Sequence, residues 1–141
     1  MPDEIAIQQV LNRYSDGCTR RDWDQVAATF LPDGIWEVPA LGTFHQGWAA
    51  MQPAMAGFVA QMDYFVQLNS PAVIEVAGDA ATARSTIREC GKFAGRDEAL
   101  EVMGYYADEL VRTAAGWRFA RRTFRGLGVH RFPLSAGPAL G

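Results

Sequence analysis

The chain has few of the residue types that build disulfide and metal sites. Cysteine occurs only at Cys18 and Cys90. Because they lie far apart and form no CxxC pair, we interpret both as reduced thiols. The two histidines, His45 and His130, stand alone in the sequence. A zinc or iron site would therefore have to be assembled from distant segments, and we expect neither a metal nor another cofactor.

Basic charge and long apolar runs are also scarce. The 13 Lys and Arg residues are outnumbered by 16 Asp and Glu, giving a net charge of -3 without a basic stripe. This balance argues against nucleic acid as a partner. No segment approaches the ~18 apolar residues of a membrane span, and the first residues are acidic where a secretory signal is basic. We expect a cytoplasmic protein without a membrane partner, whose ligand is a small apolar or aromatic molecule.

What is present is the composition of one globular domain: 141 residues, 49% apolar and 21% charged. Three amphipathic segments predict helices. The first covers about residues 3–20. The second begins after Asp22 and ends at the turn chemistry of residues 32–34. The third spans about residues 48–62, with Pro53 either in its first turn or at a kink.

The rest of the chain is rich in strand signals. Helices that come first and a meander that comes last predict an α+β fold with one large, strongly bent antiparallel sheet. The domain is expected to cover residues 1–126, because the tail at 127–141 lacks periodicity and is predicted to wrap the surface or a cavity mouth irregularly. The predicted strands are two short ones at 35–38 and 43–46 and four long runs at 64–77, 80–92, 99–113 and 116–125.

One carboxylate falls on the wrong face of a predicted strand. In the run at 82–93 alternate residues form a largely apolar face, and Glu89 lies on it. Burial of an unpaired carboxylate costs several kcal/mol or raises its pKa, so Glu89 needs a buried partner, a wet cavity or a proton-transfer role. We interpret it as a general acid or base. The alternative is a buried ion pair with Arg121 or Arg125, which share parity with the apolar residues of the last strand.

Five further residues are candidates for contact with the ligand, and other interpretations of them stay open. Tyr14, on the inward stripe of the first helix, could bind a substrate oxygen, or be a core tyrosine. Gln67 and Asn69 share a strand face and could orient a ligand, or mark an irregular strand. Parity places Tyr105 on the concave face, although the opposite assignment stays open. Trp36 would belong to an aromatic lining suited to a planar or polycyclic ligand, or to the core.

Five short motifs occur in a fixed order: Tyr14, residues 21–24 (RDWD), Phe30 with residues 33–36 (DGIW), residues 78–81 (GDAA) and residues 116–122 (GWRFARR). Together they resemble a SnoaL-like member of the nuclear transport factor-like (cystatin-like) superfamily, distantly similar to scytalone dehydratase-like and bile-acid dehydratase-like enzymes. The resemblance implies a cone-shaped α+β barrel, in which three N-terminal helices pack on a bent, mixed or antiparallel sheet around a pocket. The convex face often forms a dimer in this family, so a homodimer is expected.

The resemblance also bears on chemistry. Family dehydratases and dehydrochlorinases pair an Asp late in the first helix with a His on the first long strand, and these positions fall on Thr19 and Gln67, with Leu68 or Asn69 as the alternatives to Gln67 if the strand slips. Neither residue is a base near neutral pH, so the Asp–His mechanism is not expected here. Thr19 and Gln67 are instead candidates for substrate contact. In the bile-acid dehydratase-like branch, a carboxylate on the central strand aligns with Glu89.

These observations lead to one functional hypothesis and two alternatives. The hypothesis is a cofactor-independent isomerase, cyclase or dehydratase acting on an apolar or polycyclic carbonyl or hydroxyl compound. Glu89 would be the acid and base, and Tyr14 with Gln67 or Tyr105 would hold the oxygen. The alternatives are a non-catalytic ligand-binding or dimerisation module, and the small subunit of an aromatic-ring dioxygenase.

Overall fold

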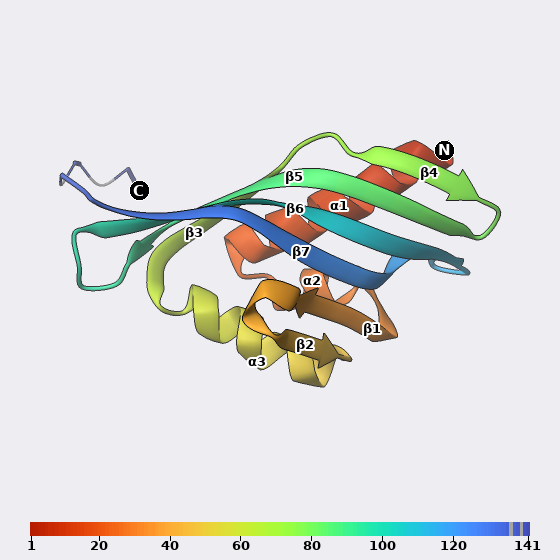
Figure 1. The fold of residues 1–141 in the computed structure, drawn as a ribbon, viewed down its shortest axis with the longest axis horizontal. Coiled ribbons are helices and arrows are strands. Elements are labelled where there is room, and N and C mark those ends of the chain that lie inside the picture. The colour runs from red at the N-terminus through yellow and green to blue at the C-terminus, as the bar shows by residue number, and fades with distance from the viewer. Residues whose placement is uncertain (136, 139) are drawn as a thin grey trace.

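The computed structural model describes residues 1–135, 137–138 and 140–141. Seven strands form one strongly bent sheet in the order β2-β1-β7-β6-β5-β3, with β4 paired to β5 (Figure 1). The sheet is mixed, because β1 runs parallel to β7 while the other pairs are antiparallel. The predicted α+β cone is confirmed, but its sheet does not close into a barrel. The elements are α1 (Asp3–Arg20), α2 (Trp23–Ala27), β1 (Phe30–Val38), the 3-10 turn η1 (Pro39–Leu41), β2 (Thr43–Gln46), α3 (Trp48–Val59), β3 (Met62–Asn69), β4 (Val73–Ala77), β5 (Ala80–Phe93), β6 (Glu98–Thr113) and β7 (Gly116–Pro133).

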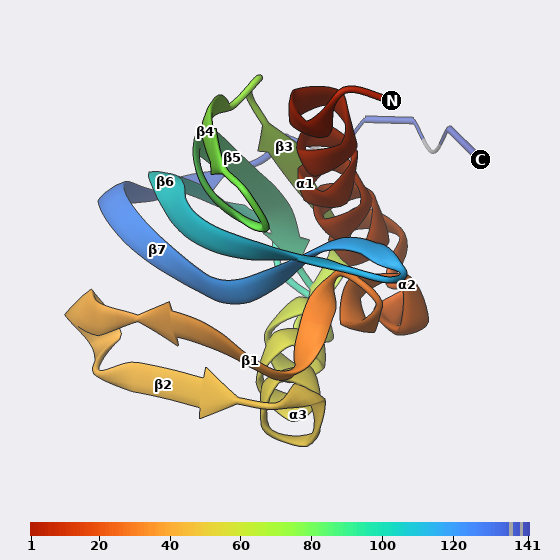
Figure 2. The same cartoon turned by 90° about the vertical axis from the view of Figure 1, so that its right-hand side faces the viewer.

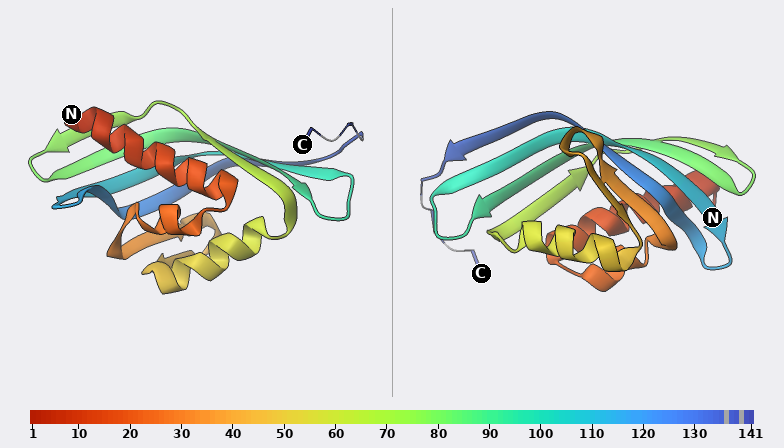
Figure 3. Two further views of the ribbon diagram at one scale, coloured as in Figure 1. Left: turned by 180° about the vertical axis from the view of Figure 1, so that it is seen from behind. Right: turned by 60° about the horizontal axis from the view of Figure 1, so that its bottom comes forward.

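The helices cover the concave face of the sheet (Figures 2 and 3). α1 begins and ends where the sequence predicts, and it buries one stripe against the strands. The predicted cap of α2 is also confirmed, because the Asp22 carboxylate accepts the backbone N–H of Gln25 at 3.0 Å. No helix in the described part of the chain is long and apolar enough to cross a membrane. The buried residues of α1 are Ile7, Val10, Leu11, Tyr14, Ser15, Gly17 and Cys18.

The turn predicted at residues 32–34 is instead part of β1. The register of β1 against β7 breaks between Phe30 and Ile35, so these residues form an irregular stretch of strand. Proline is tolerated at such bulges because no ladder hydrogen bond is lost. A Cβ on Gly34 would lie 3.0 Å from the Leu31 carbonyl oxygen, so glycine permits this close approach. α3 is shorter than predicted, and Pro53 lies in its second turn, not its first.

The long strands differ from the prediction at their ends. The run predicted at 64–77 is divided into β3 and β4. β7 continues to Pro133, so the prediction of an irregular tail from residue 127 is wrong for its first part. The pairs Val102–Val129 and Glu98–Pro133 carry the ladder beyond the point where the sequence loses its strand signal. Gly126 and Gly128 weaken that signal, because glycine disfavours strands in general.

Two irregularities in β7 decide which side chains face the concave side. The register against β6 shifts between Glu109 and Leu110 and again between Met103 and Gly104. In each case β7 contains the extra residue, Ala120 and then Leu127, which has no partner on β6. An extra residue reverses the alternation beyond it. Trp117 and Phe119 face inward before the first shift; Arg122 and Phe124 are buried or partly buried after it.

Candidate functional site

The concave side of the sheet encloses a cavity of about 580 Å³. Its walls come from α1, α2, α3, the β1–η1 segment and strands β3, β5, β6 and β7. Most of the lining is apolar, and the polar side chains that reach it form two small groups. The lining residues are Tyr14, Cys18, Trp23, Trp36, Val38, Ala40, Leu41, Met55, Phe58, Val59, Phe65, Gln67, Glu89, Leu100, Val102, Tyr106, Phe124, Gly126, Leu127, Gly128 and Val129.

Glu89 lines this cavity from the inward face of β5, as the strand parity predicts. Burial among apolar side chains disfavours its carboxylate and raises the pKa of Glu89 to about 7. A hydrogen bond from the Gln67 amide, 2.8 Å from Glu89 Oε1, opposes the shift and is the smaller influence. The alternative prediction, an ion pair between Glu89 and Arg121 or Arg125, is wrong, because Glu89 forms no ion pair in the part of the chain that the structure describes. Arg121 instead lies 2.8 Å from Glu37.

The amide of Gln67 is held in one orientation. Ser15 Oγ donates to Gln67 Oε1 at 3.0 Å, so the Nε2 group is the one that faces Glu89. The backbone N–H of Gln67 donates to Thr19 Oγ1, also at 3.0 Å. The two positions at which the resemblance places the family's Asp and His therefore do meet. Thr19 itself does not line the cavity, so it fastens β3 to α1 and does not contact the ligand space.

The second polar group is a pair of buried tyrosines. The hydroxyls of Tyr14 and Tyr106 are 3.2 Å apart, and Trp36 Nε1 donates to the Tyr106 oxygen at 3.1 Å. The Tyr14–Tyr106 contact uses one of the two hydroxyl hydrogens. The other hydrogen stays available to a ligand oxygen. Burial raises the pKa of both tyrosines, so both hydroxyls are protonated donors at neutral pH.

A buried ion pair lies directly behind these tyrosines. Arg122 binds Asp108 with two hydrogen bonds of 2.7 and 3.0 Å, and its guanidinium carbon is 3.8 Å from the Tyr106 ring centroid and 4.3 Å from that of Tyr14. Its positive charge lowers the pKa of Tyr106 against the larger effect of burial. It also favours partial negative charge on the hydroxyl oxygens. Arg122 is thus placed to make Tyr106 a stronger donor.

Besides Thr19, two candidates from the sequence lie outside the cavity. The prediction that Tyr105 faces the concave side is wrong: its neighbour Tyr106 faces inward, and Tyr105 lines a separate cavity of about 550 Å³ with Arg84 and Thr86. Parity could not decide between them because both faces of β6 carry large apolar residues. Asn69 is also absent from the lining, and its Nδ2 donates to Asn12 Oδ1 at 3.1 Å.

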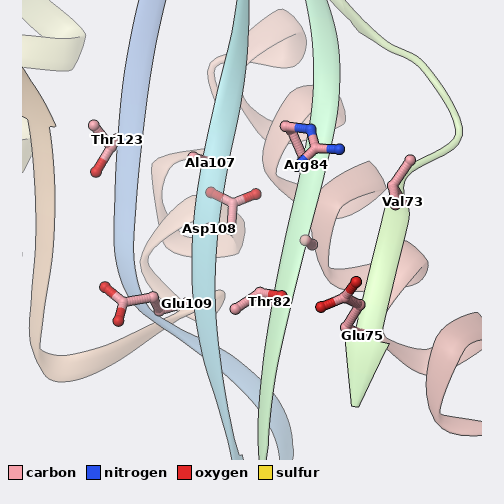
Figure 4. Close-up of a pocket in the computed structure, with 9 residues that line it drawn as sticks. Val73, Glu75, Thr82, Arg84, Ala107, Asp108, Glu109 and Thr123 are labelled. Carbon is pink, nitrogen blue, oxygen red and sulfur yellow. The ribbon is translucent and has the colours of Figure 1, made fainter.

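The outer side of the sheet has a different character. Figure 4 looks onto β4, β5, β6 and β7 with α1 behind them, where a cavity of about 320 Å³ lies. Glu75, Arg84 and Glu109 are among the residues that line it. These charges contrast with the apolar lining of the concave cavity, which is therefore the candidate site for an apolar ligand.

Three contributors to the site were missed by sequence reasoning. Tyr106 was assigned to the other face of β6. Ser15 is recognisable in retrospect, because it lies on the same helical stripe as Leu11 and Cys18. Val129 falls in the tail that the sequence predicts to be irregular, where only the apolar residues between Gly126 and His130 point to a strand.

Comparisons with known proteins agree with this architecture. The family model for the SnoaL-like domain matches residues 1–123. An uncharacterized protein of Mycobacterium tuberculosis strain H37Rv is 29% identical over 121 residues, covering 85% of this chain and 82% of the relative. An uncharacterized protein of Mycobacterium bovis matches with the same identity and coverage.

Solved structures show the same fold. A protein of Novosphingobium aromaticivorans provisionally assigned as an aromatic ring hydroxylase has a TM-score of 0.84 at 25% identity, covering 94% of this chain and 96% of that one. A provisional scytalone dehydratase of the same organism has a TM-score of 0.81 at 22% identity, with coverage of 96% and 91%. The hexachlorocyclohexane dehydrochlorinase LinA type 3 of Novosphingobium barchaimii has a TM-score of 0.83 at 17% identity, with coverage of 95% and 94%. The two structures below 25% identity show the fold alone.

Proposed function

The chain belongs to the SnoaL-like domain family, and on that premise we propose that it binds a small apolar compound bearing a carbonyl or hydroxyl group and moves a proton on it without a cofactor. The observation that carries the proposal is Glu89, a carboxyl group with a pKa of about 7 in the wall of an apolar cavity. A general base works best when its pKa lies near the working pH. At neutral pH, Glu89 is present in both the accepting and the donating form.

In the proposed reaction the Glu89 carboxylate takes a proton from the carbon next to the substrate carbonyl. The electron pair of the broken C–H bond moves to the carbonyl oxygen, which then carries negative charge. The free hydroxyl hydrogen of the Tyr14–Tyr106 pair binds that oxygen, and the charge of Arg122 behind the ring favours it. Return of the proton from Glu89 to a carbon conjugated with the enolate completes an isomerisation. Departure of a hydroxyl from the carbon beyond the deprotonated one, as water formed with the proton from Glu89, completes a dehydratase-type elimination.

Gln67 and Ser15 take the role of positioning groups in this scheme. The hydrogen bond from Gln67 Nε2 fixes one oxygen of Glu89 and leaves the other free for the substrate. Ser15 holds the Gln67 amide in that orientation.

The test uses deuterium exchange, which reports proton transfer before the natural substrate is known. 1-Tetralone, a bicyclic ketone, is incubated with the protein in D₂O, and loss of the proton signal next to its carbonyl is followed by NMR. We expect Glu89→Gln to reduce the exchange rate by about 10²-fold or more, because general-base catalysis contributes about that much. Tyr106→Phe should also reduce it. Glu75→Gln, on the exposed face of β4, is the matched control and should leave the rate unchanged.

The second candidate function is a non-catalytic ligand-binding module. It is favoured by Thr19 and Gln67, which replace the ionisable pair of the family dehydratases with groups that do not titrate. Binding of 1-tetralone, followed by tryptophan fluorescence, separates the two functions. Binding without exchange above the buffer rate, at any pH between about 5 and 9, would establish the module and overturn the catalytic proposal.

A further inference from the structure

The most exposed large apolar residues of the cavity lining lie where β1 leaves β7, and we take this place as the entrance. The parallel pairing of these strands ends at Glu37 and Thr123, after which β1 passes into η1 while β7 continues alone on that edge. Beyond this point, residues of both segments line the cavity. They are Val38, Ala40 and Leu41 on one side and Gly126, Leu127, Gly128 and Val129 on the other.

The rim of this entrance is apolar although water reaches it. Leu41 is 75% exposed, Leu127 is 73% exposed and Val129 is 62% exposed, yet all three line the cavity. Single exposed apolar residues are ordinary, but a group continuous with an apolar cavity indicates a binding surface. The apolar lining therefore continues from the interior to the outside of the protein.

The polar groups lie in a definite order along the strands that lead to this rim. Tyr106 pairs with Phe124, whereas Glu89 is level with Val102 and Val129, four residues nearer the entrance. The wall of β6 from Tyr106 to Leu100 is about 20 Å long at the usual strand rise. The cavity is thus elongated, with the oxygen-binding tyrosine at its inner part, the carboxylate further out and apolar side chains beyond.

Glycine keeps the passage between the inner cavity and the apolar rim wide. A Cβ on Gly126 would lie 3.7 Å from the Phe124 ring, and one on Gly128 would lie 3.8 Å from His130, which are ordinary contacts. Neither glycine has the positive φ that would require the absence of a side chain. A larger residue at Gly126 would therefore fit the backbone and occupy space beside the passage.

We infer that the ligand is a head-and-tail molecule, with one carbonyl or hydroxyl group beside Tyr106 and an unbranched apolar tail that passes Glu89 and lies over Leu41 and Val129 at the rim. This inference deepens the proposed function and rests on its binding step. It favours an elongated, lipid-like carbonyl compound over a compact polycyclic one. A polycyclic ligand would fill the inner cavity and leave the apolar rim uncovered.

The test is a series of straight-chain methyl ketones from 2-hexanone to 2-tridecanone. Binding is followed through the fluorescence of Trp23 and Trp36, which line the cavity. Each added methylene that enters an apolar environment should tighten binding by about fourfold. We expect this gain to continue through the longer ketones, because the tail still finds apolar side chains at the rim.

Substitutions at the rim should act on long ligands alone. The double variant Leu41→Ser with Val129→Ser should weaken 2-tridecanone binding by about tenfold or more and leave 2-hexanone unchanged. Gly126→Val should likewise reject the long ketones selectively. The matched control is Leu68→Ser with Val73→Ser, since these residues are 56% and 60% exposed and do not line the cavity.

Several outcomes would overturn the inference. These are an affinity that stops rising at the short ketones, rim variants that weaken all ketones equally, and rim variants that change the size of the particle in solution but not affinity. The fate of the proposed function is read separately from deuterium exchange. If 1-tetralone exchanges but the rim variants bind all ketones like the wild type, the proposed chemistry stands and the inferred apolar tail is refuted. If the rim variants weaken the long ketones but no exchange occurs, the inferred tail stands and the proposed chemistry is refuted.

Discussion

Replacing Glu89 with glutamine should stabilise the protein at neutral and alkaline pH, even though the residue is the proposed acid and base. Glutamine has nearly the shape of a protonated glutamate, and its Oε1 can still accept the Gln67 hydrogen bond. What disappears is the charge. The pKa of Glu89 rises from an ordinary 4.5 to about 7 on folding, which corresponds to about 3 kcal/mol that ionisation takes from the folded state.

The sign of the effect depends on pH in a definite way. Between about pH 4.5 and 7 the folded protein holds a proton on Glu89 that the unfolded chain has released, so stability falls as the pH rises. Below that window Glu89 is protonated in both the folded and the unfolded state. Above it Glu89 is ionised in both states, and the loss of stability is complete. The advantage of Glu89→Gln should therefore be near zero at about pH 4, grow through the window and level off at about 3 kcal/mol above pH 8.

Urea unfolding at a series of pH values measures this difference directly. Other carboxylates titrate equally in both proteins and cancel in the comparison. In a thermal melt at about pH 8, the variant should have a midpoint roughly 10 °C higher than the wild type. Glu75→Gln is the control and should show no such pH-dependent gain, because Glu75 lies on the exposed face of β4. A stability difference that does not vary with pH would refute the argument that burial disfavours the Glu89 carboxylate.

Two other predictions concern charges in the fold, and both are measured by urea unfolding. Asp108→Ala should destabilise the protein by about 3–5 kcal/mol because it leaves the fully buried Arg122 without its partner; Arg121→Gln breaks the more exposed pair with Glu37 and should cost under about 1 kcal/mol. Equal costs would contradict the difference in burial. Asp22→Ala should cost about 1 kcal/mol through loss of the α2 cap, and an unchanged midpoint would show that this short helix does not depend on its cap.

The site residues that sequence predicted best lie on regular elements. β5 has no irregularity between Ala80 and Lys92 against β6, so counting by twos assigns Glu89 to the correct face. The stripe of α1 placed Tyr14 equally well. Both assignments rest on an unbroken period over a long element.

The failures came from local irregularities and from faces of similar character. The extra residue Ala120 reverses the alternation of β7, so Arg122 and not Arg121 is buried. Tyr105 and Tyr106 are adjacent and of equal size, so parity had no means to choose between them. Gly126 and Gly128 have low strand propensity, so the sequence does not indicate that β7 continues past them. β7 tolerates both glycines in the stretch that pairs with β6 on one side.

The two unpaired residues of β7 mark the places where this strand can change its length over generations. Deletion of Ala120 would leave Arg121 opposite Glu109 and Arg122 opposite Asp108, because Ala120 itself has no partner on β6. Deletion of a paired residue would instead move every later side chain to the other face of the sheet, unless Ala120 then took a partner. Changes of amino-acid type along this strand act on one position at a time, whereas a change in the number of paired residues alters many positions at once. The number of paired residues between Phe119 and Val129 should thus be more strictly inherited than their identities.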